Sequence, residues 1–219
     1  MFADIPYYWE KLMYPAFFAT VRMGLGTMVI GMVLGFVLSI FLTLYHPNGL
    51  KPNGKIYPLL NFLVNSIRSF PILILIVAIS PLTRWIIGTT IGEAAAIVPL
   101  SIAATAFIAR LLENCFMEVD RQLIEAARSF GATNMQIIFR VIIRESVPGM
   151  ISALTMASVT YIAGTTIAGA VGGGGLGAVA LTYGFQSFNN TVLYMAVFML
   201  FLMVNVTQFI GDWLYKKYR

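Results

Sequence analysis

The residues from Ser146 to Gly211 include no Asp, Glu, Lys or Arg, and this run constrains the fold more than any other feature. A soluble domain carries about 25% charged residues, whereas this chain has 11% charged and 59% hydrophobic residues. Such a chain is solvated mainly by lipid. The sequence therefore predicts an all-α polytopic membrane protein in which residues 1–219 form a single transmembrane domain.

Five membrane spans are expected from the positions of charged and helix-breaking residues. The Ser146–Gly211 run is too long for one helix, and the glycine-rich stretch from Gly172 to Gly177 divides it in two. Arg68 separates two charge-free halves that are each short for a hydrocarbon core of about 30 Å, so we expect one helix there, bent at Pro71. The expected spans are 20–45, 58–82, 91–112, 147–171 and 191–214.

Residues 113–146, here called the elbow segment, are polar and have the pattern of two short helices. In the first helix, apolar residues recur at helical spacing, at Leu123, Ile124, Ala127 and Phe130. Gly131 is placed to end this helix in a left-handed conformation. Thr133 and Gln136 have capping-box spacing, which predicts a second helix from Asn134 to about Glu145. Such a helix–glycine–helix unit has a shape that docks into a groove of a partner protein.

The distribution of Lys and Arg predicts which side of the membrane the elbow segment faces. Ten of these residues are expected on its side, namely Lys51, Lys55, Arg110, Arg121, Arg128, Arg140, Arg144, Lys216, Lys217 and Arg219. Three are expected on the other side, namely Lys11, Arg22 and Arg84. Because cytoplasmic loops carry the excess of Lys and Arg, we expect the elbow segment and the C-terminus to be cytoplasmic.

Several kinds of site are not supported by the sequence. The stretch Gly49–Lys55 has the spacing of a phosphate-binding loop, but it is followed by Ile56 instead of Ser or Thr, and no strand precedes it. One histidine, His46, and one cysteine, Cys115, do not form a usual metal site. No Ser-His-Asp or paired-carboxylate arrangement is present, and the net charge of +5 is too scattered for nucleic acid. We therefore expect no catalytic residue, metal, cofactor or nucleic-acid partner.

Other kinds of membrane protein fit the sequence less well. An ion-coupled carrier usually places acidic or histidine residues inside its spans, whereas Glu93, Glu113 and Asp212 lie at expected span ends. A simple pore needs a polar lining on several spans, and the last two spans offer only scattered Ser, Thr, Asn and Gln. A membrane scaffold remains an alternative that does not explain the elbow segment.

The elbow segment resembles the cytoplasmic signature of permease subunits of ATP-binding-cassette importers. That signature is Glu-Ala-Ala, three residues, Gly, nine residues, Ile, one residue, then Leu-Pro. Glu125-Ala126-Ala127 and Gly131 match it, and Val141 is a conservative replacement of the Ile. The closing pair differs, since Ile143-Arg144 replaces Leu-Pro, so Pro148 is a candidate for the bend into the next span.

Further stretches resemble, more narrowly, the permeases of methionine importers. They are Arg68-Ser69-Phe70-Pro71, Ala95–Leu100, Phe107–Arg110, Glu113-Asn114 and Val171–Gly177. The resemblance implies a pathway formed by two copies of the chain in the bacterial plasma (inner) membrane. It also implies cytoplasmic ATP-binding-cassette ATPase subunits that hydrolyse ATP and an extracytoplasmic substrate-binding protein or lipoprotein. The alternative substrates are another amino acid or a small peptide.

Two groups of residues are candidates for these roles. The resemblance implies that the ATPase is contacted by Glu125, Ala126, Ala127, Arg128, Gly131 and Ala132. Candidates for the pathway or its gate are Arg68, Tyr161, Thr165, Thr166, Gly172 and Gly175. Arg68, in an apolar span, either extends to the cytoplasmic interface or acts in gating. The glycine-rich stretch is either a flexible outer loop or, as we favour, a place of close helix or subunit contact.

Overall fold

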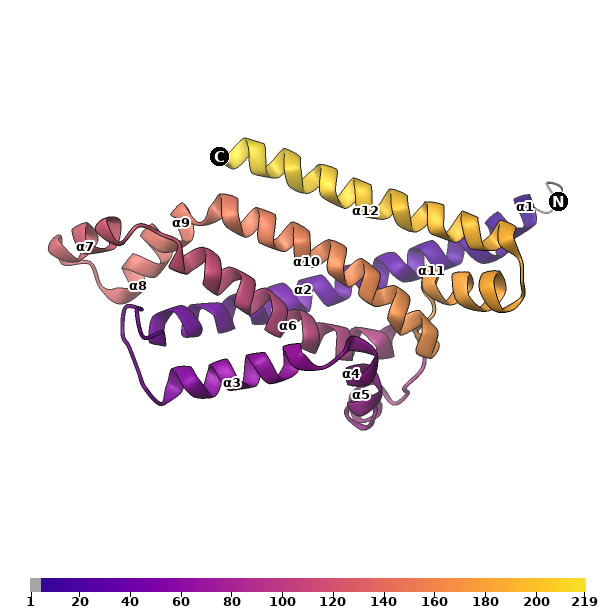
Figure 1. Ribbon diagram of the computed structural model, residues 1–219, viewed down its shortest axis with the longest axis horizontal. Coiled ribbons are helices and arrows are strands. Elements are labelled where there is room, and N and C mark those ends of the chain that lie inside the picture. The colour runs from indigo at the N-terminus through magenta and orange to yellow at the C-terminus, as the bar shows by residue number, and fades with distance from the viewer. Residues whose placement is uncertain (1–4) are drawn as a thin grey trace.

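The computed structural model describes residues 5–219, and all its regular elements are helices (Figure 1), which confirms the all-α prediction. The α-helices and the π-helical turns (η) follow one another as α1 (Ile5–Tyr8), η1 (Trp9–Met13), α2 (Tyr14–Tyr45), α3 (Ile56–Ser69), α4 (Ile72–Ala78), α5 (Ser80–Ile87), α6 (Glu93–Met117), α7 (Arg121–Ser129), α8 (Asn134–Ile137), η2 (Ile138–Ile142), α9 (Ile143–Glu145), α10 (Val147–Ala168), η3 (Gly169–Gly173), α11 (Gly175–Ala178), η4 (Val179–Gln186) and α12 (Asn190–Tyr218).

The first span is longer than the expected 20–45. Helical structure continues from Pro6 to Tyr45, over 40 residues. At 1.5 Å per residue this helix is about 60 Å long, roughly twice the thickness of a hydrocarbon core. Its early part is rich in Tyr and Trp, which favour the membrane interface, so hydropathy alone places the start of the helix too late.

The second expected span, 58–82, is not one bent helix. Helix α3 ends at Ser69, α4 begins at Ile72, and the two are inclined at 103°. Phe70 and Pro71 are extended between them, with ψ angles of 130° and 134°. Proline removes a backbone donor and disfavours the helical conformation of the residue before it, so the helix stops instead of bending.

The later spans lie near their expected positions. Helix α6 (Glu93–Met117) begins two residues after the start of the expected span 91–112 and extends beyond its end into the elbow segment. Helix α12 (Asn190–Tyr218) covers the expected 191–214. Between α10 and α12 the chain forms η3, α11 and η4, so the region expected to be an outer loop is largely helical.

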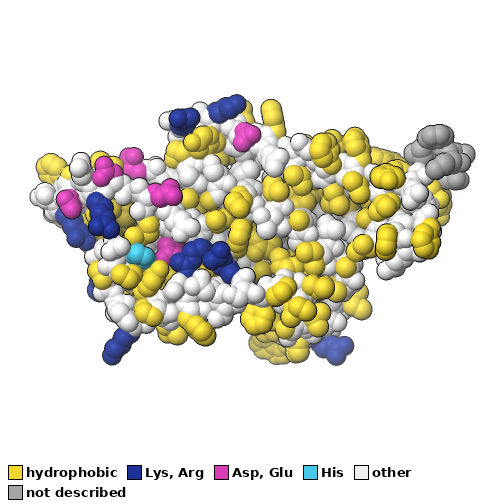
Figure 2. Space-filling view, in the orientation of Figure 1, with side chains coloured by type: hydrophobic (Ala, Val, Ile, Leu, Met, Phe, Trp, Pro, Cys, Tyr) yellow, Lys and Arg dark blue, Asp and Glu magenta, His cyan; other side chains and the backbone are white. Residues whose placement is uncertain are grey.

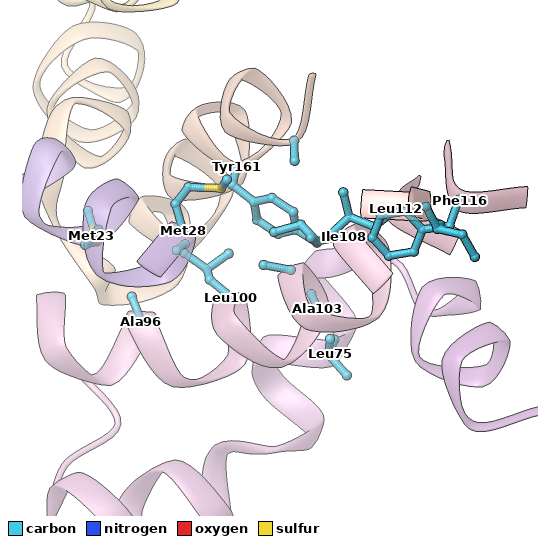
Figure 3. Packing of buried hydrophobic residues seen from close by; sticks show 14 of the residues in the cluster. Met23, Met28, Leu75, Ala96, Leu100, Ala103, Ile108, Leu112, Phe116 and Tyr161 are labelled. Carbon is cyan, nitrogen blue, oxygen red and sulfur yellow. The ribbon is translucent and has the colours of Figure 1, made fainter. Parts of the chain in front are cut away.

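The core lies where α2, α4, α6 and α10 meet (Figure 3). Its fully buried side chains include Met23, Leu100, Ile108 and Leu112. Small residues bring α2 against α6, since a Cβ added at Gly31 would lie 2.6 Å from that of Ala104. Close contact through small residues is the usual means of helix association in lipid, where burial of apolar surface gives little drive.

Two hydrogen bonds define the two ends of the bundle. Arg128 Nη2 donates to the Leu50 carbonyl at 3.0 Å, so the elbow segment lies at the α2–α3 turn; this is the elbow end. Gly92 N donates to the Gly172 carbonyl at 2.8 Å at the opposite end. The α3–α5 segment therefore runs from the elbow end toward the opposite end (Figure 1). Helices α2, α6, α10 and α12 also lie along this axis, some of them in the reverse direction.

Charged side chains are concentrated toward the elbow end. Figure 2 shows most Lys, Arg, Asp and Glu of the visible face over the elbow segment and near the C-terminus of α12, with hydrophobic side chains over the remaining length. This distribution is typical of a chain whose middle is surrounded by lipid.

Candidate functional site

Helix α7, which carries the Glu-Ala-Ala signature, is closed at both ends by local hydrogen bonds. The Asp120 carboxylate caps its start by accepting from Gln122 N at 2.9 Å. At its end, Gly131 N donates to the Arg128 carbonyl at 2.9 Å and Ala132 N to the Ala127 carbonyl at 3.1 Å. This pair of bonds is a Schellman motif, and Gly131 has the left-handed φ of +77° that the motif requires.

The second half of the elbow segment begins at the expected capping box. Gln136 N donates to Thr133 Oγ1 at 3.3 Å, and Thr133 N donates to Gln136 Oε1 at 2.9 Å. Helical structure then continues through α8, η2 and α9 to Glu145, as the sequence predicts. Pro148 lies in the first turn of α10, where proline is tolerated in a helix.

The coupling residues expected from the sequence form two layers. Glu125, Ala126 and Gly131 are exposed. Ala127 and Ala132 are partly buried and pack against the core, which anchors α7 to the bundle. Arg128 is exposed in part, but its guanidinium is bonded to the α2–α3 turn, so it holds the elbow segment in place within this chain.

Phe130 is the residue at this site that the sequence analysis did not select. Its side chain is 92% exposed and follows directly after α7, beside Gly131. Leu123 and Met135 are also exposed on the elbow segment. Exposed apolar groups outside the lipid-facing spans usually mark a protein contact. The sequence did show Phe130 as part of the apolar stripe in this half of the elbow segment. In the structure, Ile124 and Ala127 of that stripe pack against the core, while Leu123 and Phe130 are exposed.

The elbow segment is attached to both spans that flank it. Ser146 Oγ, at the start of α10, donates to the Cys115 carbonyl near the end of α6 at 3.1 Å. Ile137, Ile138 and Ile142 are buried in the same core as these helices. The segment is therefore a packed part of the bundle that connects α6 to α10.

The residues expected to line the pathway do not form one surface in this chain. Tyr161 is buried beside Phe107, with ring centroids 6.1 Å apart, and Thr165 is buried with its hydroxyl donating to the Ile162 carbonyl. Thr166 is partly buried, and Arg68 is exposed at the end of α3, next to the break before α4. Tyr161 and Thr165 thus act here as packing residues of the core.

The glycine-rich stretch makes close contacts within the chain instead of a flexible loop. Gly175 has a φ of +76°, and a Cβ there would lie 2.6 Å from Thr20 Oγ1 on α2. The same hydroxyl accepts from Leu176 N at 2.9 Å. Gly172 is exposed, with a φ of +92° and its carbonyl bonded to Gly92.

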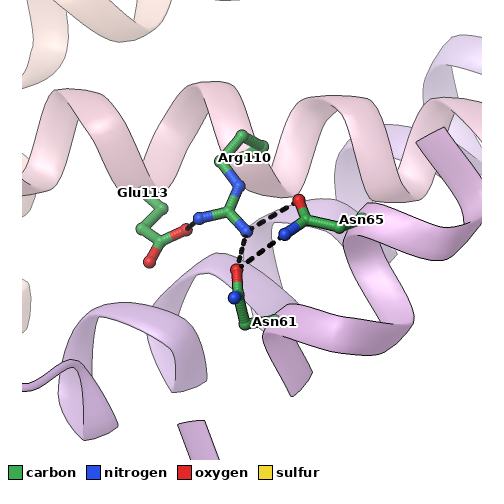
Figure 4. Close-up of polar contacts among 4 residues, drawn as sticks. All are labelled: Asn61, Asn65, Arg110 and Glu113. Carbon is green, nitrogen blue, oxygen red and sulfur yellow. Dashed lines mark hydrogen bonds and ion pairs between the residues drawn. The ribbon is translucent and has the colours of Figure 1, made fainter. Parts of the chain in front are cut away.

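A polar cluster joins α3 to α6, from the buried Glu113 to the exposed Asn65 (Figure 4). Arg110 Nη1 donates to Glu113 Oε2 at 2.7 Å, and these side chains are 16% and 2% exposed. Arg110 Nη2 donates to Asn61 Oδ1 and, at 3.2 Å, to Asn65 Oδ1. Buried charges in a membrane protein are costly unless they are paired, and this arrangement pairs them. The sequence analysis placed Arg110 and Glu113 near a span end but did not predict their contact with the two asparagines.

The sequence is similar to curated permeases of methionine transport systems. It is 44% identical over 188 residues to the probable D-methionine transport system permease protein MetI of Vibrio cholerae, covering 86% of this chain and 84% of that protein. It is 42% identical over 160 residues to the methionine import system permease protein MetP of Bacillus subtilis, covering 73% of this chain and 72% of that protein.

Solved structures show the same fold. A chain of the MetNI methionine ABC transporter, described in inward-facing conformations, matches with a TM-score of 0.94 and 37% identity over 98% of both chains. An amino acid ABC transporter matches with a TM-score of 0.81 at 18% identity, which supports the fold alone. Residues 35–219 match the family described as "Binding-protein-dependent transport system inner membrane component". The chain therefore belongs to this family of inner-membrane permeases, as the signature in the elbow segment indicates.

Proposed function

We propose that this chain forms the membrane pathway of an ATP-driven importer of methionine. The observation that carries the proposal is the elbow segment, in which exposed Glu125 and Ala126 lie on a helix closed by a Schellman motif at Gly131. Its relatives are named as methionine permeases, and its fold matches that of a methionine transporter chain.

The chain itself hydrolyses no ATP in this proposal, and separate ATPase subunits contact the elbow segment. Phe130, 92% exposed, inserts into an apolar groove of the ATPase, and Glu125 and Ala126 lie against its surface. Two copies of the chain enclose the pathway, because one bundle of this size encloses little space. ATP-driven approach of the ATPase subunits brings the two elbow segments together and tilts α10, which begins directly after them.

The elbow end and the C-terminus are cytoplasmic in this proposal. Ten Lys and Arg residues belong to that end by sequence, against Lys11, Arg22 and Arg84 at the other. A reporter active only in the cytoplasm should be active when fused after Arg219, and should be inactive when fused after Thr182. An inactive Arg219 fusion in a protein that is stably inserted reverses the orientation.

Uptake of labelled methionine tests the transport proposal. A bacterial strain lacking its other methionine uptake routes should lose growth on low methionine when this chain is deleted, and the intact chain should restore both growth and uptake. An extracytoplasmic binding protein supplies most of the selectivity in this proposal. Unchanged methionine uptake in the deletion strain contradicts the substrate, and a panel of other amino acids and small peptides then identifies the cargo.

A further inference from the structure

An open cavity of about 320 Å³ lies between α10 and α12, toward the C-terminal end of α12. This volume is within the range of small-molecule sites, about 300–1,000 Å³. Its polar lining consists of Ser152, Thr155, Thr160, Gln208, Asp212 and Tyr215. No part of the elbow segment or of the polar cluster around Arg110 contributes to it, so it is a separate site.

A close helix contact forms one wall of the cavity. A Cβ added at Gly211 would lie 2.2 Å from Thr155 Oγ1, so α12 approaches α10 as closely as a glycine allows. The pairing of Gly211 with Thr155 therefore sets Asp212 and Thr155 on neighbouring parts of the lining.

The lining is rich in hydrogen-bond acceptors. Thr155 Oγ1 donates its proton to the Ile151 carbonyl and Thr160 Oγ1 to the Met156 carbonyl, each at 2.8 Å. Both hydroxyls therefore offer only lone pairs to a ligand. Asp212 adds a carboxylate, so the site favours a group with several donors.

Asp212 has no counter-ion within residues 5–219 of the structure. Lys217, one of the nearby basic residues in sequence, lies over the Trp213 ring, 5.4 Å from its centroid. Asp212 is exposed at the mouth of the cavity, near the C-terminal end of α12, and a carboxylate there gains from a charged donor that enters the site. An ammonium group, with one positive charge and three N–H donors, meets this requirement.

We propose that this cavity binds the primary ammonium group of a small amphipathic molecule, with Asp212 as its counter-ion and the oxygens of Thr155 and Thr160 as acceptors. Gln208 and Tyr215 supply donors for an anionic group on the same molecule, and Met156 supplies an apolar wall. A free amino acid and the headgroup of phosphatidylethanolamine both have this chemistry. The assignment of the ligand as a free amino acid rests on the proposed function, whereas the ammonium-binding site itself does not.

Photo-crosslinking to the assembled permease–ATPase complex in lipid nanodiscs tests the site. The probes are photo-methionine and photo-leucine, which carry a diazirine in the side chain, and a phosphatidylethanolamine that carries one in an acyl chain. Peptides that contain residues 152–160 or 208–215 should be labelled by at least one probe. Excess unlabelled amino acid should compete, and N-acetylmethionine, which lacks the ammonium group, should not.

Asp212→Asn keeps the shape of the side chain and removes its charge, so we expect labelling of the cavity to fall about tenfold or more. Asp212→Glu should retain it. Glu10→Gln, an exposed acid-to-amide change outside the cavity, is the matched control and should label as wild type. Loss of amino-acid labelling in Asp212→Asn assigns the site to free amino acids, and loss of lipid labelling assigns it to the headgroup.

Absence of labelling by all three probes, or equal labelling of wild type and Asp212→Asn, overturns the site. The proposed function is measured separately, as methionine uptake by the wild-type protein. A wild-type protein that takes up methionine but is not labelled at the cavity contradicts only the cavity, and absent uptake with Asp212-dependent labelling contradicts only the substrate.

Discussion

The polar cluster between α3 and α6 gives a prediction whose size follows from the structure. Arg110→Met keeps most of the length of the side chain and removes the guanidinium. The change leaves the Glu113 carboxylate buried, with its side chain 2% exposed and without the bond at 2.7 Å. Glu113 Oε1 already has no hydrogen-bond partner among the described residues.

Removing one partner of a buried ion pair costs about 3–5 kcal/mol. For a chain of this size, each 1 kcal/mol lowers the melting temperature by about 2–4 °C. Arg110→Met should therefore melt about 6–20 °C below the wild type. The double variant Arg110→Met/Glu113→Gln removes both charges and should recover most of this loss, because a neutral pair carries a much smaller desolvation cost.

Thermal unfolding of the purified permease–ATPase complex measures these differences. Arg22→Met is the matched control, since it breaks the Arg22–Glu93 pair, which has the same 2.7 Å distance but side chains 60% and 33% exposed. Water screens that pair, so its loss should change the melting temperature far less. The reasoning is refuted if Arg110→Met melts like the wild type, or if the double variant melts no higher than the single one.

Three further changes have defined outcomes. Gly131→Leu places a side chain at a φ of +77°, which costs about 1–2 kcal/mol. This variant should lose co-purification with the ATPase subunit. Gly54→Leu changes another glycine of the elbow end that has open space around it, and it should still co-purify. Ser146→Ala removes the bond between α10 and α6 and should raise the ATP hydrolysed per methionine imported, whereas Ser158→Ala, which removes a bond within α10, should leave that ratio unchanged. Gly175→Ala should lower thermal stability, and an unchanged melting temperature would contradict the tight contact with α2.

The elbow segment was predictable from sequence because its structure depends on local interactions. The left-handed Gly131 and the capping box at Thr133 each follow from a few neighbouring residues, and both have the expected geometry. The break at Pro71 shows the limit of such reasoning. Hydropathy predicted a crossing, but it did not distinguish a bent helix from two helices at 103°.

Contacts between distant segments were beyond the sequence pattern. Arg110 meets Asn61 and Asn65 because α3 packs against α6, and no periodicity on either helix indicates that pairing. Tyr161 was a candidate for the pathway or its gate, and in the structure its ring packs beside Phe107 in the core. Phe130 was visible as one of several apolar residues in the first half of the elbow segment, and only the fold separates the exposed members from the buried ones.

The two ends of the bundle are built differently, and this difference bears on how movement passes through the chain. At the elbow end, Arg128 binds the α2–α3 turn and Ser146 binds the end of α6, so a force on the elbow segment acts on several helices at once. At the opposite end, the glycine-rich stretch connects α10 to α11 through backbone at φ values of +92° at Gly172 and +76° at Gly175. Glycine allows both conformations, and the turn at Gly175 is held by Thr20 of α2, whose hydroxyl accepts from Leu176 N. We therefore expect the elbow end to move as one body, and a change in chain direction at the opposite end to occur at the exposed Gly172 and not at the packed Gly175.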